Sequence, residues 1–304
     1  MASFNIEDAA FVGPGLIARK PLAVIAWTAI WAVFLVVLTA PFAGIMAAFI
    51  TLNVKSPGHL DPGAALPLVG ALCAWALLLW IGSLLLGAMV QSAVIRAVLK
   101  PQDSSLAYLR FGREETFVLS VNFVKSLILV AISIVAGAGL GIVEAMLGGA
   151  GAGTLATARV VGDLVILGVA AWVNLRFSLA AAMSFRERHF RLFEAWTLTR
   201  GMDGRLIGVL TIVILMAAAT WLVTACVGLG GGILIQNGGS HVTDLRNLLA
   251  LEPGAWGPVV APYVALAGLM SLVAGTLITP IALAPWVHIY QVLSATAEVE
   301  AEAG

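Results

Sequence analysis

Four polar side chains within long apolar stretches have the chemistry of an anion-binding site. Lys125 and Arg176 carry positive charge, and Asn122 and Asn174 add amide donors. A charge in hydrocarbon costs at least ~2.5 kcal/mol unless it finds a partner or water. Counted along two helices, the four side chains lie at a comparable depth of roughly 9 to 17 Å. Because no carboxylate is expected at that level, an anionic guest such as a lipid phosphate would complete the site.

The same two cations have a simpler interpretation. Lys125 and Arg176 extend along their aliphatic stems to the membrane surface, or Lys125 pairs with Glu114 or Glu115 near the start of its helix. The sequence favours this interpretation and leaves the anion site open.

Two acids lie near the opposite ends of the same apolar stretches. Glu144 precedes a glycine-rich connection, and Asp163 follows Arg159 by four residues. This spacing on a helix predicts a structural ion pair. A proton path would need a carboxylate near the middle of the membrane, and none is evident.

The densest positive cluster of the chain lies between two apolar stretches and contains regularly spaced aromatic residues. The aromatic residues recur at every third position, which predicts an amphipathic helix lying on the membrane surface. The residues of this interfacial segment are Arg186, Arg188, Phe190, Arg191, Phe193, Trp196, Arg200 and Arg205.

The composition is that of a polytopic membrane protein. The chain has 304 residues, of which 61% are hydrophobic and 11% charged, and its mean hydropathy is +1.03. A net charge of zero gives no sign of nucleic-acid binding. The acidic start of the chain, without a basic leader, makes a cleaved signal peptide unexpected.

No motif of a known enzyme class is present. The sequence lacks Gly-x-Ser-x-Gly, His-Glu-x-x-His and a phosphate-binding glycine loop in a strand context. Its histidines have no metal-ligand spacing, even where His59 and His241 fall near acids, so we expect no metal and no cofactor. Cys73 and Cys226 lie in apolar stretches and are expected to stay unpaired.

Six apolar stretches predict an all-α fold with one six-helix membrane domain over residues 1–293. Pro280 and Pro285 are expected to break or kink the last helix. An acidic, disordered tail is expected at 294–304. The predicted spans are about 21–52, 66–99, 116–147, 155–185, 206–235 and 258–293.

The distribution of Lys and Arg predicts the orientation. Six spans place both ends of the chain on the same side, together with the interfacial segment. Eleven basic residues fall on that side and three, Lys55, Arg159 and Arg246, on the other. The positive-inside rule therefore predicts cytoplasmic termini in a cell inner membrane.

A weak internal repeat relates the start of the chain to the interfacial segment. At one constant offset Asp8 pairs with Glu194, Gly15 with Gly201 and Arg19 with Arg205. This indicates three copies of a unit made of an inner amphipathic helix and two spans. The alternative is that membrane interfaces select similar residue types.

Several short motifs resemble the six-span family named after the glycerophosphodiester phosphodiesterase membrane domain. They are Phe4-x-Ile-x-x-Ala followed by Arg19-Lys-Pro, Arg176-Phe-Ser-Leu-Ala-Ala, Glu194-Ala-Trp-Thr-Leu-Thr-Arg-Gly, Arg205-Leu-Ile-Gly and Pro285-Trp-Val-His-Ile-Tyr. Ala181 stands where the family has a proline. Some members carry a fused phosphodiesterase domain, and this chain has no polar stretch long enough for one. The resemblance implies an architecture more than an activity.

Two functional hypotheses follow. The first is a non-enzymatic membrane protein that binds anionic lipid, or a partner protein or second copy, at its basic face. The second is a transporter or flippase-like permease for an anionic or amphiphilic substrate that uses Arg176, Lys125 and a broken sixth span.

Overall fold

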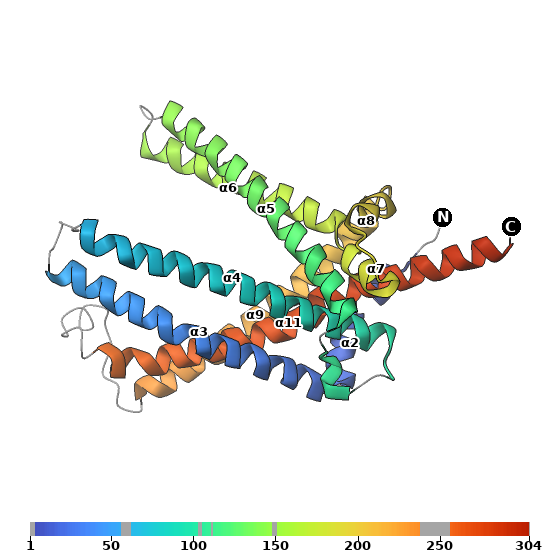
Figure 1. Cartoon of the computed structure of the whole chain (residues 1–304), viewed down its shortest axis with the longest axis horizontal. Helices are drawn as coiled ribbons and strands as arrows, with labels where there is room; N and C mark the ends of the chain where they lie inside the picture. The colour runs from blue at the N-terminus through green and yellow to red at the C-terminus, as the bar shows by residue number, and fades with distance from the viewer. Residues whose placement is uncertain are drawn as a thin grey trace. The chain divides into compact units, whose positions relative to one another are not determined.

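The computed structural model describes residues 4–55, 62–102, 105–110, 112–147, 151–237 and 256–303. Over these residues the chain is helical and contains no strand. The predicted all-α fold is therefore confirmed. The long helices are α3 (Pro21–Lys55), α4 (Pro62–Leu99), α5 (Arg113–Met146), α6 (Ala152–Arg176), α9 (Asp203–Asn237) and α11 (Trp256–Ala303) (Figure 1).

Six segments of these helices are long and apolar enough to cross a membrane, which makes the chain a multi-pass membrane protein. Many of their large apolar side chains are exposed, as expected of residues that face lipid. The candidate spans are Pro21–Phe49, Ala65–Leu99, Arg113–Met146, Gly153–Glu187, Asp203–Leu234 and Pro262–Thr296.

Five shorter elements connect or precede the long helices. Their lengths of four to eight residues are too short to cross a membrane. They are α1 (Ile6–Ala10), α2 (Val12–Arg19), the 3₁₀ turn η1 (Ser105–Tyr108), α7 (Ala180–Glu187) and α8 (Leu192–Leu198).

The fourth predicted span, 155–185, is interrupted. Helix α6 ends at Arg176, and the next three residues form a turn before α7 begins at Ala180. The turn is tighter than an α-helix, since the amide of Ser178 donates to the carbonyl of Leu175 over 3.2 Å. This turn lets Arg176 meet the residues that follow α8.

The last helix is longer than predicted. Helix α11 continues through Pro280 and Pro285, where a break or kink is expected, and through the expected disordered tail as far as Ala303. Each proline removes only one backbone donor, a loss that packed membrane helices tolerate. Alanine and glutamate, which dominate the tail, are strong helix formers.

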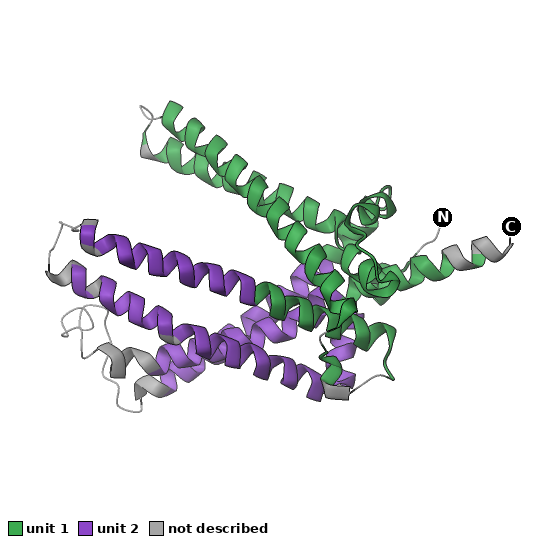
Figure 2. Ribbon diagram, in the orientation of Figure 1, with its two compact units in different colours: residues 1–10, 83–210, 284–304 green, residues 11–82, 211–283 purple. Residues whose placement is uncertain are grey.

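The chain forms two compact units (Figure 2). Unit 1 comprises residues 1–10, 83–210 and 284–304, and unit 2 comprises residues 11–82 and 211–283. Three long helices, α4, α9 and α11, contribute one part to each unit.

Unit 1 has its core around α7. All six residues from Ala180 to Phe185 are buried, and they pack against buried residues of α5 such as Val118 and Val121. The three alanines 180–182 have short side chains, which lets the neighbouring helix approach closely. The core of unit 1 thus includes the packed contact between α7 and α5.

Helices α5 and α6 form a hairpin within unit 1 (Figure 1). A Cβ at Gly162 would lie only 2.5 Å from a methyl carbon of Leu140, so this glycine permits the close contact. Gly137 and Gly141, whose spacing suggests close packing, have open space at their Cβ positions.

Unit 2 is held by contacts between pairs of helices. In the α3–α4 pair the indole of Trp75 donates to the carbonyl of Leu38 over 2.9 Å and stacks on Phe42. In the α9–α11 pair Gly228 and Gly231 face side chains of α11.

Candidate functional site

A buried ion pair links α4 to the start of α5 in unit 1. Arg96 and Glu115 are only 4% and 1% exposed, and the guanidinium donates directly to the carboxylate. Arg96 also donates to the carbonyl of Tyr108 over 2.7 Å. Glu115 accepts the amide of Gly112 over 2.8 Å and so caps the first turn of α5. This pair fixes the hairpin between α4 and α5.

Beside this pair, the carboxylate of Glu114 is shared by three cations. Its oxygens lie 3.4 Å from Arg96, 3.5 Å from the Lys100 ammonium and 2.9 Å from Arg188. Arg188 reaches it from the turn after α7, where its backbone is left-handed (φ 56°, ψ 35°). Glu114 and Glu115 together face three cations, so positive charge is in excess by one at this cluster.

Arg176 lies in a second cluster of unit 1, in which its own side chain is buried. Its guanidinium donates to the carbonyl of Thr199 over 2.9 Å and lies 2.7 Å from a carboxylate oxygen of Asp203. It also contacts the rings of Trp172 and Trp196, at 5.5 and 5.8 Å from their centroids. The expectation that no carboxylate lies near Arg176 is wrong, because the turns after α6 and α8 bring Asp203 to it.

The other residues that were predicted to form the anion site each have different surroundings. The amide of Asn122 donates to Gln91 of α4 over 2.7 Å, and that of Asn174 donates to a carbonyl of its own helix. Lys125 makes no ion pair with any residue that the structure describes. Its proposed pairing with Glu114 or Glu115 is absent, since Arg96, Lys100 and Arg188 occupy these carboxylates.

The predicted ion pair at the far end of the α5–α6 hairpin is present with a different partner. Arg159 donates to both oxygens of Glu144, over 2.8 and 2.9 Å. The pair ties α6 to α5.

The interfacial segment, where an amphipathic helix is expected, covers the end of α7, all of α8 and the start of α9. After the turn at Arg188, Leu192–Leu198 forms α8, Gly201 turns the chain again with a φ of +85°, and α9 begins at Asp203. Phe193 is 66% exposed, and Phe190 is exposed as well, whereas Trp196 packs against Phe177 and Trp172.

The arginines of this segment differ in their surroundings. Arg191 is paired with Glu187 and Glu194, and the hydrogen bond to Glu194 raises the pKa of its guanidinium. Arg200 and Arg205 are exposed and make no ion pair within the described part of the chain.

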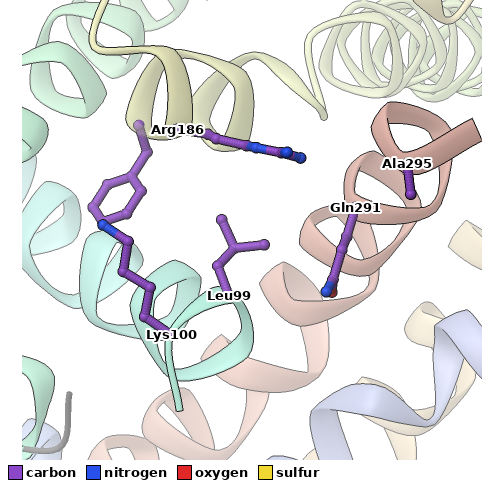
Figure 3. A pocket seen from close by; sticks show the side chains of 6 residues that line it. Leu99, Lys100, Arg186, Gln291 and Ala295 are labelled. Carbon is purple, nitrogen blue, oxygen red and sulfur yellow. The ribbon is translucent and has the colours of Figure 1, made fainter. Parts of the chain in front are cut away.

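A pocket of about 330 Å³ opens beside Phe185 in unit 1, and we call it the Lys100–Arg186 pocket. Its side chains come from the end of α4, from α7 and from α11 (Figure 3). The lining residues are Leu99, Lys100, Phe185, Arg186, Gln291 and Ala295. From the sequence, Arg186 belongs to the interfacial segment, and Lys100 is one of the eleven basic residues on the same side.

One signal for these missed contacts is visible in the sequence. Arg96 lies three residues before Leu99, the end of one span, and Glu114 and Glu115 lie in the first turn of the next span. A hairpin between the two spans must bring these opposite charges together. Gln291 has no comparable signal, because the residues of α4 and α7 that line the pocket with it are far away along the chain.

No group of three or more metal-ligating side chains occurs among the residues that the structure describes. His59 and His241 lie outside those residues. Cys73 and Cys226 are both free.

Comparisons of the chain with protein-family models, with curated proteins and with solved structures found no match. The resemblance to the glycerophosphodiester phosphodiesterase membrane domain, and the threefold repeat, therefore stay predictions.

Proposed function

We propose that this multi-pass membrane protein is non-enzymatic and binds anionic lipid through the segment 190–205. One observation carries the proposal. The segment presents the exposed ring of Phe193 together with two exposed arginines, Arg200 and Arg205, that make no ion pair with other described residues.

Each part of this surface has a physical role at a membrane. An aromatic ring is stable at the level of the lipid headgroups, where its apolar body leaves water. A cation near an anionic membrane surface gains about 1 kcal/mol. Arg191 contributes less, because Glu187 and Glu194 already neutralise it.

The location of the proposed contact follows from the positive-inside rule. We place segment 190–205 at the cytoplasmic leaflet of a cell inner membrane, with both ends of the chain on the same side. This leaflet carries the negative surface potential that the arginines require.

The test uses the full chain in nanodiscs of neutral or of partly anionic lipid. An environment-sensitive fluorophore at Thr197→Cys, with Cys73 and Cys226 replaced by alanine, reports on the surroundings of α8. We expect a blue shift in anionic nanodiscs that high salt reduces.

The double variant Arg200→Gln/Arg205→Gln should lose this shift. The matched control is Arg191→Gln, which removes an arginine that is already paired and should keep most of it. Equal emission in neutral and anionic nanodiscs would contradict the proposal. A shift seen only in native membranes would instead indicate a protein partner.

A further inference from the structure

We propose that the Lys100–Arg186 pocket is a binding site for a phosphate-type oxyanion that carries an apolar group. None of the exposed residues of segment 190–205 lines this pocket, so the inference is independent of the lipid contact proposed above.

The charges of the lining residues point to an anion. The pocket is lined by two cations and one amide, and none of its six lining residues is acidic. The nearby carboxylate of Glu114 is shared with Arg96 and Arg188, so it neutralises Lys100 only in part. An anion in the pocket would therefore lie beside two cations.

The donors suit an oxyanion in particular. Arg186 has a planar guanidinium, a shape that matches two oxygens of a phosphate, and it also donates to the hydroxyl of Ser294. Lys100 supplies a compact point charge. Gln291 has an amide that donates without charge. In Figure 3 the side chains of Lys100, Arg186 and Gln291 lie around one space, and they come from the end of α4, from α7 and from α11.

The remaining lining residues are apolar, which indicates that the ligand also carries an apolar group. Phe185 is buried at the pocket, with the Lys100 ammonium 5.8 Å from its ring centroid. Leu99 and Ala295 add further apolar surface. A volume of about 330 Å³ exceeds that of a bare phosphate and leaves room for a glycerol or a similar group.

The pocket lies at the depth where lipid phosphates occur. Leu99 is the last residue of the candidate span Ala65–Leu99, and Gln291 and Ala295 lie near the end of the span Pro262–Thr296. Headgroups begin where apolar spans end. A phospholipid headgroup therefore matches the pocket in charge, shape and depth, and a free organic phosphate matches it in charge and shape.

The test measures binding to the full chain, purified in neutral detergent and stripped of lipid. Native mass spectrometry counts bound phosphatidic acid and phosphatidylcholine, and titration with inorganic phosphate follows the free anion. We expect one tightly bound phosphatidic acid per chain and weaker binding of phosphatidylcholine.

Two variants of the pocket sharpen the test. Arg186→Gln should weaken the binding of phosphatidic acid tenfold or more. Gln291→Glu, nearly equal in size, should abolish it by adding a negative charge. The control Arg19→Gln removes an exposed cation of unit 2 and should leave this binding unchanged.

The outcomes separate the two sources of the anion. Loss of lipid binding in both pocket variants, without competition by inorganic phosphate, supports a lipid headgroup site. Binding of inorganic phosphate that both variants weaken supports a site for a free phosphate ester. Unchanged binding of lipid and phosphate in folded Arg186→Gln and Gln291→Glu proteins would overturn the inference, whatever the behaviour of Arg200 and Arg205.

Discussion

At the scale of single residues, the buried pair of Arg96 and Glu115 is expected to contribute strongly to stability. Glu115→Gln keeps an oxygen for the amide of Gly112 but leaves the buried charge of Arg96 with only the shared carboxylate of Glu114, 3.4 Å away. Loss of one partner of such a pair costs about 3 kcal/mol. We expect a clear fall in the midpoint of unfolding in a denaturing-detergent titration.

A control and a double variant test the cause of this loss. Glu194→Gln removes an exposed carboxylate and should change the unfolding midpoint very little. Arg96→Met/Glu115→Met should recover part of the stability, because no buried charge remains. A double variant as unstable as Glu115→Gln would contradict the explanation.

Arg176 gives a second prediction at this scale. Arg176→Lys keeps the charge but loses the planar contact with Trp172 and Trp196 and one of the two polar contacts. We expect a loss of about 1–2 kcal/mol in the free energy of unfolding. Arg159→Lys, the same change at an exposed arginine, should have a smaller effect. Equal effects at the two positions would show that the ring contacts do not contribute.

The residue scale is also where sequence reasoning succeeded least. Arg176 and Lys125 were identifiable as unusual because they are charges in apolar stretches. Their partners were not, because Asp203 approaches Arg176 only after two turns whose geometry depends on tertiary contacts. Counting residues along straight helices predicts the depth of a side chain in the membrane, but it cannot predict such turns.

At the scale of elements, the helix α2 makes a sharp prediction about close packing in unit 2. A Cβ at Gly13 would lie 2.6 Å from both the Cα of Ile281 and the carbonyl oxygen of Pro280, which are backbone atoms of α11. Backbone atoms cannot move aside cheaply, so Gly13→Ala should displace α2 and cost about 1–3 kcal/mol.

Gly15 provides the matched control on the same helix. A Cβ at Gly15 has open space around it, so Gly15→Ala should be neutral or stabilise α2 by about 0.5–1 kcal/mol. Thermal unfolding in detergent compares the two variants, and protease cleavage near the N-terminus reports on the displacement of α2. Equal stability of the two variants would show that α2 does not pack on α11 at this point.

Elements were predicted well where hydrophobicity alone determines them. All six long apolar stretches are helices, because a backbone in hydrocarbon must satisfy its own hydrogen bonds. The ends of helices and the short elements were predicted less well. The turn at 177–179 and the helix through Pro280 and Pro285 depend on neighbouring helices that no local pattern describes.

At the scale of the whole molecule, the distribution of charge connects the fold with the proposed function. The buried ion pairs, the Lys100–Arg186 pocket and segment 190–205 all belong to unit 1. The far end of the α5–α6 hairpin carries the single arginine Arg159, which Glu144 neutralises. The two ends of unit 1 thus differ in their available positive charge, which is the asymmetry that determines orientation in a membrane.

This asymmetry predicts which positions a membrane-impermeant maleimide can reach in intact cells. Phe193→Cys and Gly151→Cys, each in a background with Cys73→Ala and Cys226→Ala, place single thiols at exposed positions of unit 1. The two positions flank α6, whose 25 residues extend roughly 37 Å, longer than the ~30 Å hydrocarbon core.

Gly151→Cys should react in intact cells, because its end of the hairpin has little positive charge. Phe193→Cys should react only after the membrane is opened, because the arginines around it hold that end in the cytoplasm. The reverse labelling pattern would invert the topology and would place segment 190–205 and the Lys100–Arg186 pocket at the outer leaflet, where the proposed electrostatic attraction is absent.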